Sequence, residues 1–437
     1  MSIDKVKPTQ TSVVDGPKES RVQAWSLTMI LVLLYVINAA DKAVLGLVAQ
    51  PLAHELGLTS SQIGLVGSGF FLTFTVSGFF AGLLNKWVTL RWILVLLSLA
   101  WAATMVPMVL VASFTVLLVS RLALGLAEGP SSALVHTAVY SWHAPKKRGL
   151  PGAWIASGVS IAKIAIAPAL AVVVATWGWR AALVTLAVAG VAWCALWLAT
   201  WKEGPYGERG QADTASTAEG EEPQPAVPWT KIFFTPTFLG AAVAVISVYA
   251  LVSVVLTFLP SYFEVGLGYS RLEAGTMFGF PSIASMAALL VSTFISDRLL
   301  SRGASSRLLR GVLPGTGLLI CGLAMTTLPY IGAPGLTVGV VSVGYGFGTV
   351  IMPLFNAAIS QLCPPRQLAG TLGVFLALMS LGGLVAPYLT GVIVDAASSP
   401  AEGYASAFKV FGIAAVVTSL IALLTVNPER DASRVLG

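Results

Sequence analysis

The amino-acid sequence predicts an all-α polytopic membrane protein with twelve transmembrane helices in two pseudo-symmetric six-helix bundles. Hydrophobic residues make up 56% of the 437 residues and charged residues only 10%, whereas soluble domains carry about 25% charged residues. The chain contains a series of apolar runs that reach the roughly 20 residues needed to cross a bilayer. A polar segment at mid-chain separates six such runs from six more.

The first six spans follow a polar segment, residues 1–24, which lacks the basic start and short apolar core of a signal peptide. We therefore expect residues 1–24 to be a cytoplasmic tail and the first span to be retained. The six apolar runs lie at residues 25–48, 62–84, 92–112, 114–141, 150–175 and 180–200. Together they predict an N-terminal bundle over residues 25–200.

Residues 201–236 are rich in Glu, Gly, Pro, Thr and Ala, a composition typical of a flexible linker. Six further spans follow, at 237–260, 273–296, 308–329, 334–360, 367–394 and 404–426. They predict a C-terminal bundle over residues 237–426 and a tail over residues 427–437. The long runs at 114–141, 334–360 and 367–394 are expected to tilt.

The distribution of basic residues orients these spans. Nineteen Lys and Arg residues fall on one side of the predicted membrane, and only Arg180, Arg271 and Lys409 fall on the other. Because basic loops stay in the cytoplasm, we expect both termini and the linker to be cytoplasmic, in the inner or plasma membrane of the cell. The basic residues are scattered and form no tract, so the net charge of +6 does not indicate nucleic-acid binding.

Two spans in corresponding positions of the halves are similar. Residues 152–170 read GAWIASGVSIAKIAIAPAL, and residues 370–389 read GTLGVFLALMSLGGLVAPYL. Their Ala-Pro pairs, Ala167-Pro168 and Ala386-Pro387, are 219 residues apart, about half the chain. Repeated halves around a site at mid-membrane are a common design of secondary transporters.

Charged residues inside the predicted spans occur almost only in the first half: Asp41, Lys42, Arg121, Glu128 and Lys163. A charge at bilayer depth costs about 3 kcal/mol or more, so each residue needs a reason to be there. Three cations and two acids predict a buried site that binds an anion and handles a proton.

Helical spacing groups these side chains. Arg121 and Glu128 are seven residues apart and share a face, as do Tyr35, Asn38 and Lys42. Asp41 points about 100° away from Lys42 on the same helix.

Three stretches carry a resemblance to a known family. They read NAADKAVL at residues 38–45, RLALGLAEGPSS at residues 121–132, and FLPSYFEVGLGYSRLEAG at residues 258–275. In addition, Asp297-Arg298 with Arg302 is similar to a loop motif whose first copy is changed here to Asn85-Lys86 with Arg91. The chain resembles the major facilitator superfamily and, within it, the anion:cation symporter family.

This resemblance implies the major facilitator fold and a gating role for Asn85, Lys86, Arg91, Asp297 and Arg298. It also implies proton-coupled uptake of a small organic anion, such as a sugar acid, an aromatic acid or a dicarboxylate. The alternative is a proton-coupled efflux antiporter of the same fold, although the Gly-Pro-x-x-Gly-Gly signature of those exporters is missing. We expect no enzymatic activity, catalytic residues, cofactor or metal site, and a monomer in the lipid bilayer.

The charged residues are assigned roles on this basis. Lys42 is expected to bind the substrate carboxylate beside Tyr35 and Asn38, with Lys163 as a second cation. Asp41 and Glu128 are expected to carry the proton, because a buried carboxyl group resists ionisation, and Arg121 to take part in the coupling.

Structural roles remain open for several of these residues. Arg121 is equally compatible with holding spans together, Asp41-Lys42 with a buried pair, and Lys163 with neutralising Glu128. His136 is better explained as a hydrogen-bonded interior histidine. In the second half the candidate ligands are Tyr249 and Asn356, with Ser282, Tyr345 and Ser380 as further polar residues, and packing is the alternative for each.

Overall fold

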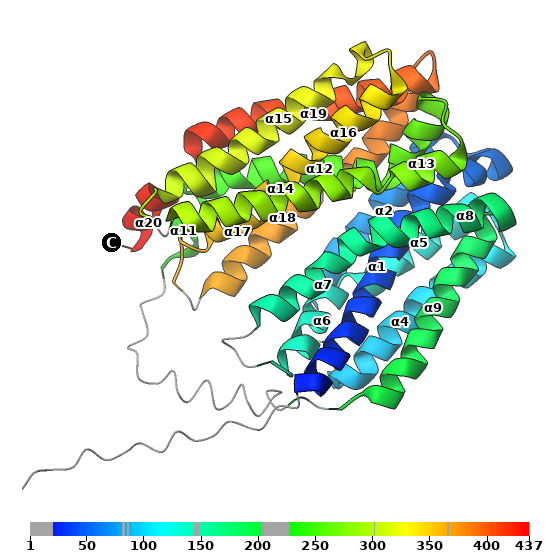
Figure 1. Cartoon of the computed structure of the whole chain (residues 1–437), viewed down its shortest axis with the longest axis horizontal. Coiled ribbons are helices and arrows are strands. Elements are labelled where there is room, and N and C mark those ends of the chain that lie inside the picture. Colours follow the sequence, from blue (N-terminus) through cyan, green and yellow to red (C-terminus); the bar gives the residue numbers. More distant parts are fainter. Residues whose placement is uncertain are drawn as a thin grey trace, which may run out of the picture.

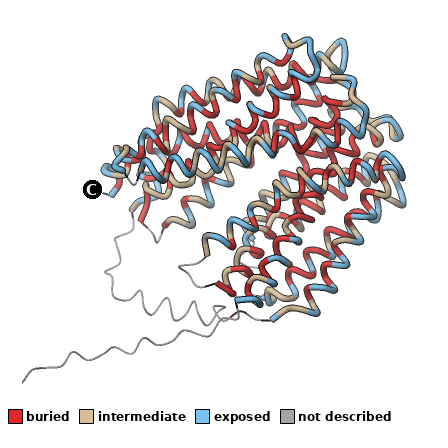
Figure 2. Tube along the Cα trace, viewed as in Figure 1, coloured by how far each residue is buried: buried red, intermediate tan, exposed pale blue. Residues whose placement is uncertain are grey.

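A computed structural model of the chain describes residues 21–80, 84, 87–143, 148–202, 204, 227–300, 302–364 and 367–436, without the side chains of Thr293, Asp297 and Ala369. Its regular structure is helical throughout this part of the chain. The helices form two bundles, one from each half of the sequence (Figure 1). Buried residues run through the middle of each bundle (Figure 2).

The N-terminal bundle contains the helices up to residue 200. They are α1 (Arg21–Leu56), α2 (Ser60–Gly78), α4 (Leu90–Leu110), α5 (Phe114–Glu128), α6 (Ser131–Tyr140), α7 (Gly149–Ile161), the π-helix η2 (Ala162–Ile166), α8 (Ala167–Trp177) and α9 (Trp179–Thr200). Residues 150–177 are helical throughout and form one span, within which η2 is a local widening.

The C-terminal bundle begins with the short α11 (Trp229–Phe233). Its helices are α12 (Pro236–Ser261), η4 (Tyr262–Gly266), α13 (Arg271–Met277), α14 (Phe280–Leu300), η5 (Leu308–Val312), α15 (Leu313–Thr327), the 3₁₀ turn η6 (Leu328–Tyr330), α16 (Pro334–Thr349), α17 (Ile351–Ile359), α18 (Leu368–Ala396), α19 (Pro400–Thr425) and α20 (Pro428–Leu436).

Ten helical segments of the described chain are long and apolar enough to cross a membrane. The predicted spans at 62–84 and 114–141 are not among them. The first corresponds to α2, whose 19 residues include several Gly, Ser and Thr. The second is divided between α5 and α6, because Gly129 and Pro130 interrupt it and each part is too short to cross alone. With these two, the predicted twelve-span fold is confirmed.

The two bundles approach each other at one end only. In Figure 1 they diverge toward the end that carries α11, α20 and the C-terminus, called here the linker end. At the other, closed end, α2 packs along α18 and α8 packs along α13. Glycines make this approach possible, since a Cβ at Gly64 would meet the backbone of Pro387, and one at Gly275 would meet the Ala171 side chain.

One acidic side chain ties the bundles together at the closed end. Asp395, at the end of α18, accepts hydrogen bonds from the backbone N–H groups of Ser60 and Ser61, each at 2.8 Å. These groups begin α2, where backbone N–H groups lack helical partners and attract negative charge. Nearby, the backbone N–H of Tyr388 donates to Ser68 Oγ at 3.1 Å.

Within the N-terminal bundle, α5 lies unusually close to α2. A Cβ at Gly125 would meet Thr73 Oγ1 and the carbonyl oxygen of Phe70, and a Cβ at Gly129 would meet Ser77 Oγ and the carbonyl oxygen of Phe74. Small residues four apart let membrane helices approach in this way. This packing fixes the end of α5, where Glu128 lies.

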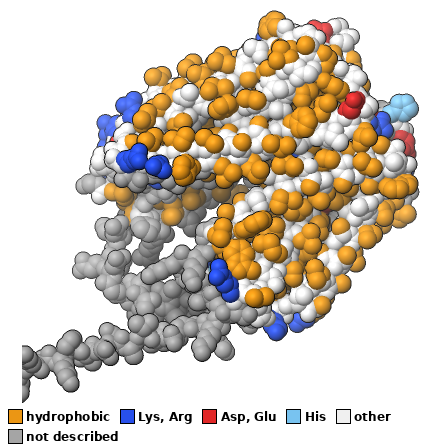
Figure 3. Space-filling view, viewed as in Figure 1, with side chains coloured by type: hydrophobic (Ala, Val, Ile, Leu, Met, Phe, Trp, Pro, Cys, Tyr) orange, Lys and Arg blue, Asp and Glu red, His pale blue; other side chains and the backbone are white. Residues whose placement is uncertain are grey.

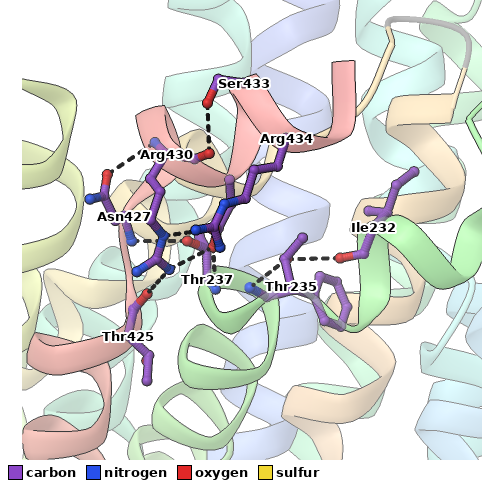
Figure 4. Close-up of polar contacts among 10 residues, drawn as sticks. Ile232, Thr235, Thr237, Thr425, Asn427, Arg430, Ser433 and Arg434 are labelled. Carbon is purple, nitrogen blue, oxygen red and sulfur yellow. Dashed lines mark hydrogen bonds and ion pairs between the residues drawn. The ribbon is translucent and has the colours of Figure 1, made fainter. Parts of the chain in front are cut away.

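Residues 428–436, predicted to be part of a tail, form a helix that docks on the bundle (Figure 4). Asp431, whose side chain is buried, accepts a hydrogen bond from the Thr237 backbone N–H at 2.9 Å and pairs with Arg430 at 2.8 Å. Burial raises the pKa of Asp431, but the bonds from Arg430 and Thr237 lower it by more, so its net pKa lies below the ordinary value. Asp431 therefore binds α20 to the first turn of α12.

We predict that Asp395→Ala opens the closed end. The substitution removes an anionic acceptor from two N–H groups and costs about 1–2 kcal/mol, enough to shift the equilibrium between closed and open by roughly tenfold. Distances between spin labels on His54 and Ala397 would show a larger separated population. Glu402→Ala is the control, because the hydrogen bonds that Glu402 makes in the described chain are to Ser398 and Ser399 of its own bundle; an equal shift in this variant would contradict the assignment.

We also predict opposite effects for two Gly-to-Ala substitutions. Gly125→Ala forces a methyl group into the α2 backbone and should cost about 1–3 kcal/mol. Gly339→Ala, on α16, meets no heavy atom within 4 Å and should be neutral or stabilising by up to about 1 kcal/mol. Thermal unfolding of the purified variants in detergent measures the difference, and equal midpoints would refute the close contact.

Candidate functional site

The candidate site is centred on Lys42, which extends from α1 toward α5. Its Nζ lies 3.0 Å from Glu128 Oε2 and donates to Asn38 Oδ1 at 2.5 Å. It also lies 4.9 Å from the ring centroid of Phe74 on α2. The Glu128 side chain is fully buried, whereas Lys42 is 20% exposed. The ion pair therefore has one enclosed member and one accessible member.

Glu128 owes its position to the break between α5 and α6. It is the last residue of α5, and Gly129-Pro130 follows. Ser131 Oγ donates to the Glu128 carbonyl oxygen at 2.5 Å, replacing a partner that the interrupted helix lacks. Apart from the ion pair, neither carboxylate oxygen accepts a well-aligned hydrogen bond from the described part of the chain. The carboxylate is therefore held mainly by Lys42.

Asp41, on α1, and Arg121, on α5, lie close to the Lys42–Glu128 pair. Both are buried, at 2% and 3% exposure. Arg121 Nη1 donates to the backbone carbonyl oxygen of Asp41 at 3.0 Å. Asp41 Oδ1 and Arg121 Nη2 make no hydrogen bond within the residues that the structure describes. The two acids, Asp41 on α1 and Glu128 on α5, are close enough to interact electrostatically, and both Lys42 and Arg121 act on each of them.

Lys163 occupies the π-helix η2 and is 5% exposed. Its Nζ lies 3.5 Å from the hydroxyl oxygen of Tyr345 on α16 and 5.6 Å from the centroid of the Tyr345 ring. The ion pairs found in the described residues do not include Lys163. It is a buried cation whose polar side-chain partner is a phenol of the opposite bundle.

Further aromatic side chains connect the two cationic positions. The hydroxyl oxygen of Tyr35 lies 3.3 Å from Ser132 Oγ, and the Tyr35 ring packs edge-on against His136. Tyr249, on α12, packs edge-on against Phe71 of the N-terminal bundle. Its phenol is close enough to those of Tyr35 and Tyr345 to interact electrostatically. The phenols of both bundles therefore lie around one central region, next to Lys163.

Other predicted residues lie elsewhere. Asn356, on α17, has a buried Oδ1 without a hydrogen-bond partner in the described chain. Arg91 contacts its own bundle, with Nη2 3.5 Å from the Leu198 carbonyl oxygen. Arg298 is exposed at the linker end of α14. Asn85 and Lys86 lie outside the described residues, as does the side chain of Asp297.

Two contacts of the site could not be found by sequence reasoning. Tyr345 was one of several polar residues in the second half, and nothing in the sequence links it to Lys163, 182 residues earlier. Phe74 belongs to an apolar run, and nothing in the sequence marks it as a residue of the site. His136, in contrast, is hydrogen-bonded as expected, with Nδ1 2.7 Å from the Ser132 carbonyl oxygen.

The buried charges of the region do not cancel. Lys42, Arg121 and Lys163 contribute three positive charges, and Asp41 and Glu128 contribute two negative charges when ionised, which leaves +1. Within the described residues, no group of three or more His, Cys, Asp or Glu side chains could hold a metal ion. The site is therefore suited electrostatically to an anion.

The amino-acid sequence is similar to those of known transporters. The chain is 25% identical to the hexuronate transporter of Bacillus subtilis (strain 168) over 410 residues, 92% of this chain and 94% of that protein. It is 26% identical to the probable galactarate/D-glucarate transporter GudP of the same organism, over 97% of this chain and 96% of that protein.

Solved structures show the same fold at lower identity. A D-xylose-proton symporter superposes with a TM-score of 0.75 at 15% identity, over 93% of this chain and 99% of that one. A bacterial homolog of the human lysosomal transporter Spinster superposes with a TM-score of 0.75 at 20% identity, over 95% and 98%. The profile of the Major Facilitator Superfamily matches residues 31–352. The chain therefore belongs to the Major Facilitator Superfamily and is a membrane transporter.

Proposed function

We propose that this transporter takes up a small organic anion together with protons, by alternating access. The observation that carries the proposal is Lys163, a buried cation that faces a phenol across the boundary between the bundles. An isolated buried cation is costly, and a carboxylate beside it would offset much of that cost. The net charge of +1 in the region supports the same ligand class.

The relatives support a sugar acid as the substrate. The printed names of several describe transporters of hexuronate, galactarate or D-glucarate, and D-galactonate. Each of these molecules combines a carboxylate with several hydroxyl groups. Lys163 and Lys42 would serve the carboxylate, while Tyr35, Tyr249 and Tyr345 would supply hydrogen-bonding groups for hydroxyls.

Proton coupling is proposed to act through Glu128. In the structure the carboxylate and Lys42 neutralise each other at 3.0 Å. Protonation of Glu128 would remove this partner and leave Lys42, the accessible member, ready to bind the substrate carboxylate. Release of the proton would restore the ion pair and displace the substrate. Asp41 and Arg121, which are buried and interact electrostatically with Glu128, would adjust the charge balance.

The side of the membrane to which the central site opens is inferred from which end of the molecule is closed. The contacts between bundles that fix the closed end lie at the end opposite α11 and the C-terminus. If the linker and both termini are cytoplasmic, as the basic residues indicate, this conformation opens toward the cytoplasm. Export by an antiporter of the same fold remains the competing outcome of the tests below.

We predict that Lys163→Gln lowers uptake of a sugar acid at least tenfold, because it removes the cation that the carboxylate would bind. Purified protein in liposomes with an inside-alkaline pH gradient would be given radiolabelled hexuronate, glucarate and galactonate. Lys409→Gln is the matched control, since Lys409 also contacts a tyrosine, Tyr330 at 2.7 Å, but lies at the closed end. Uptake unchanged in Lys163→Gln, or movement of drugs instead of acids, would refute the proposal.

We further predict that Glu128→Gln separates transport from coupling. The amide resembles the protonated acid, so counterflow exchange of labelled substrate should persist while gradient-driven accumulation falls to the equilibrium level. Glu55→Gln, which alters an ion pair with Arg180 at the closed end, should retain both activities. Accumulation retained in Glu128→Gln would exclude Glu128 as the proton carrier.

A further inference from the structure

The C-terminal bundle contains a cavity away from the central site. It lies between α14, α15 and α16 and has a volume of about 530 Å³. Its lining is almost entirely apolar and is built mostly from small or aliphatic side chains; it includes Ala284, Ala288, Ile295, Leu313, Gly317 and Phe347. None of the proposed substrate or proton residues lines it. We call it the α14–α16 groove.

The length of the groove matches one leaflet of a membrane. Its lining on α14 runs from Ala284 to Ile295, which lie eleven positions apart, or about 16 Å at 1.5 Å per residue. Half of a hydrocarbon core is about 15 Å thick. Residues beside the groove on α14, such as Ile283 and Leu290, are 46% and 63% exposed, as expected for a face that meets lipid. The groove therefore has the depth and surroundings of an acyl-chain site.

Positive charge collects at the linker end of this groove. Arg298 follows Ile295 by one turn, Arg310 precedes Leu313 by one turn, and Arg302 and Arg307 lie between them. Residues 296–312 contain one acid, Asp297, against these four arginines. Figure 3 shows Lys and Arg side chains gathered at this end of the C-terminal bundle, beyond an apolar surface.

We propose that the α14–α16 groove binds an anionic phospholipid. One acyl chain lies in the groove, and the phosphate of the headgroup contacts Arg302 and Arg307. Guanidinium groups bind phosphate oxygens in pairs, and basic pockets beside membrane helices favour anionic headgroups. The apolar lining accommodates the chain, and the arginines favour a headgroup with net negative charge because they repel the cationic group of a zwitterionic lipid.

The test uses the purified full-length transporter in detergent and measures its thermal midpoint during titration with phosphatidylglycerol, phosphatidylcholine or inorganic phosphate. Phosphatidylglycerol should raise the midpoint by roughly 5 °C, with little effect from the other two. Arg302→Gln/Arg307→Gln should abolish this rise by removing the charge, and Ala288→Phe by filling the groove.

Matched controls separate binding from a damaged fold. Ile283→Phe adds the same ring on α14 outside the groove, and Lys409→Gln removes a cation at the other end of the bundle; both should retain the rise. Equal stabilisation by phosphatidylcholine, or a rise that survives in both test variants, overturns the proposal. A rise of the same size with inorganic phosphate would identify an ion site and overturn it as well.

Discussion

The structure depends on how buried charge is accommodated in the N-terminal bundle. Lys42 and Glu128 form a contact at 3.0 Å in which the acid is fully enclosed. Removing two charges from water costs several kcal/mol each, and only a close partner offsets this cost. The close packing of α5 on α2 and the break after Glu128 hold the acid where Lys42 reaches it. The helical packing thus serves an electrostatic requirement.

The same requirement explains why the bundles differ. The second half carries almost no charge within its spans, and its polar side chains in the central region are the tyrosines Tyr249 and Tyr345. Under the 219-residue repeat, Lys163 corresponds to Gly382, where a Cβ would meet the backbone of Ile246 and Ala250. One half therefore uses this position for charge, and the other uses it for close packing.

Much of the fold could be predicted from the sequence, because each span must satisfy its own backbone and show an apolar surface to lipid. The helix breaks were harder to predict, since a break at Gly129-Pro130 changes hydropathy little. Individual residues with buried charge were also recognisable, because each is costly at that depth. Their partners were not. The Lys163–Tyr345 contact joins residues 182 positions apart in the sequence, and the bonds of Asp395 to α2 join residues more than 300 positions apart. No local sequence pattern predicts contacts between residues so widely separated.

Contacts at the closed end are of a kind that can be broken reversibly. Asp395 is exposed, so water can replace its bonds to Ser60 and Ser61 at modest cost. The contacts at the glycines of α2 and α18 are van der Waals contacts between closely packed helices. When the helices separate, few hydrogen-bonding groups lose a partner. The Lys163–Tyr345 contact differs, since its separation would leave a buried cation without a partner. Under the proposed function, a bound anion would remove that penalty, and occupation of the central site would then be linked to the movement of the bundles.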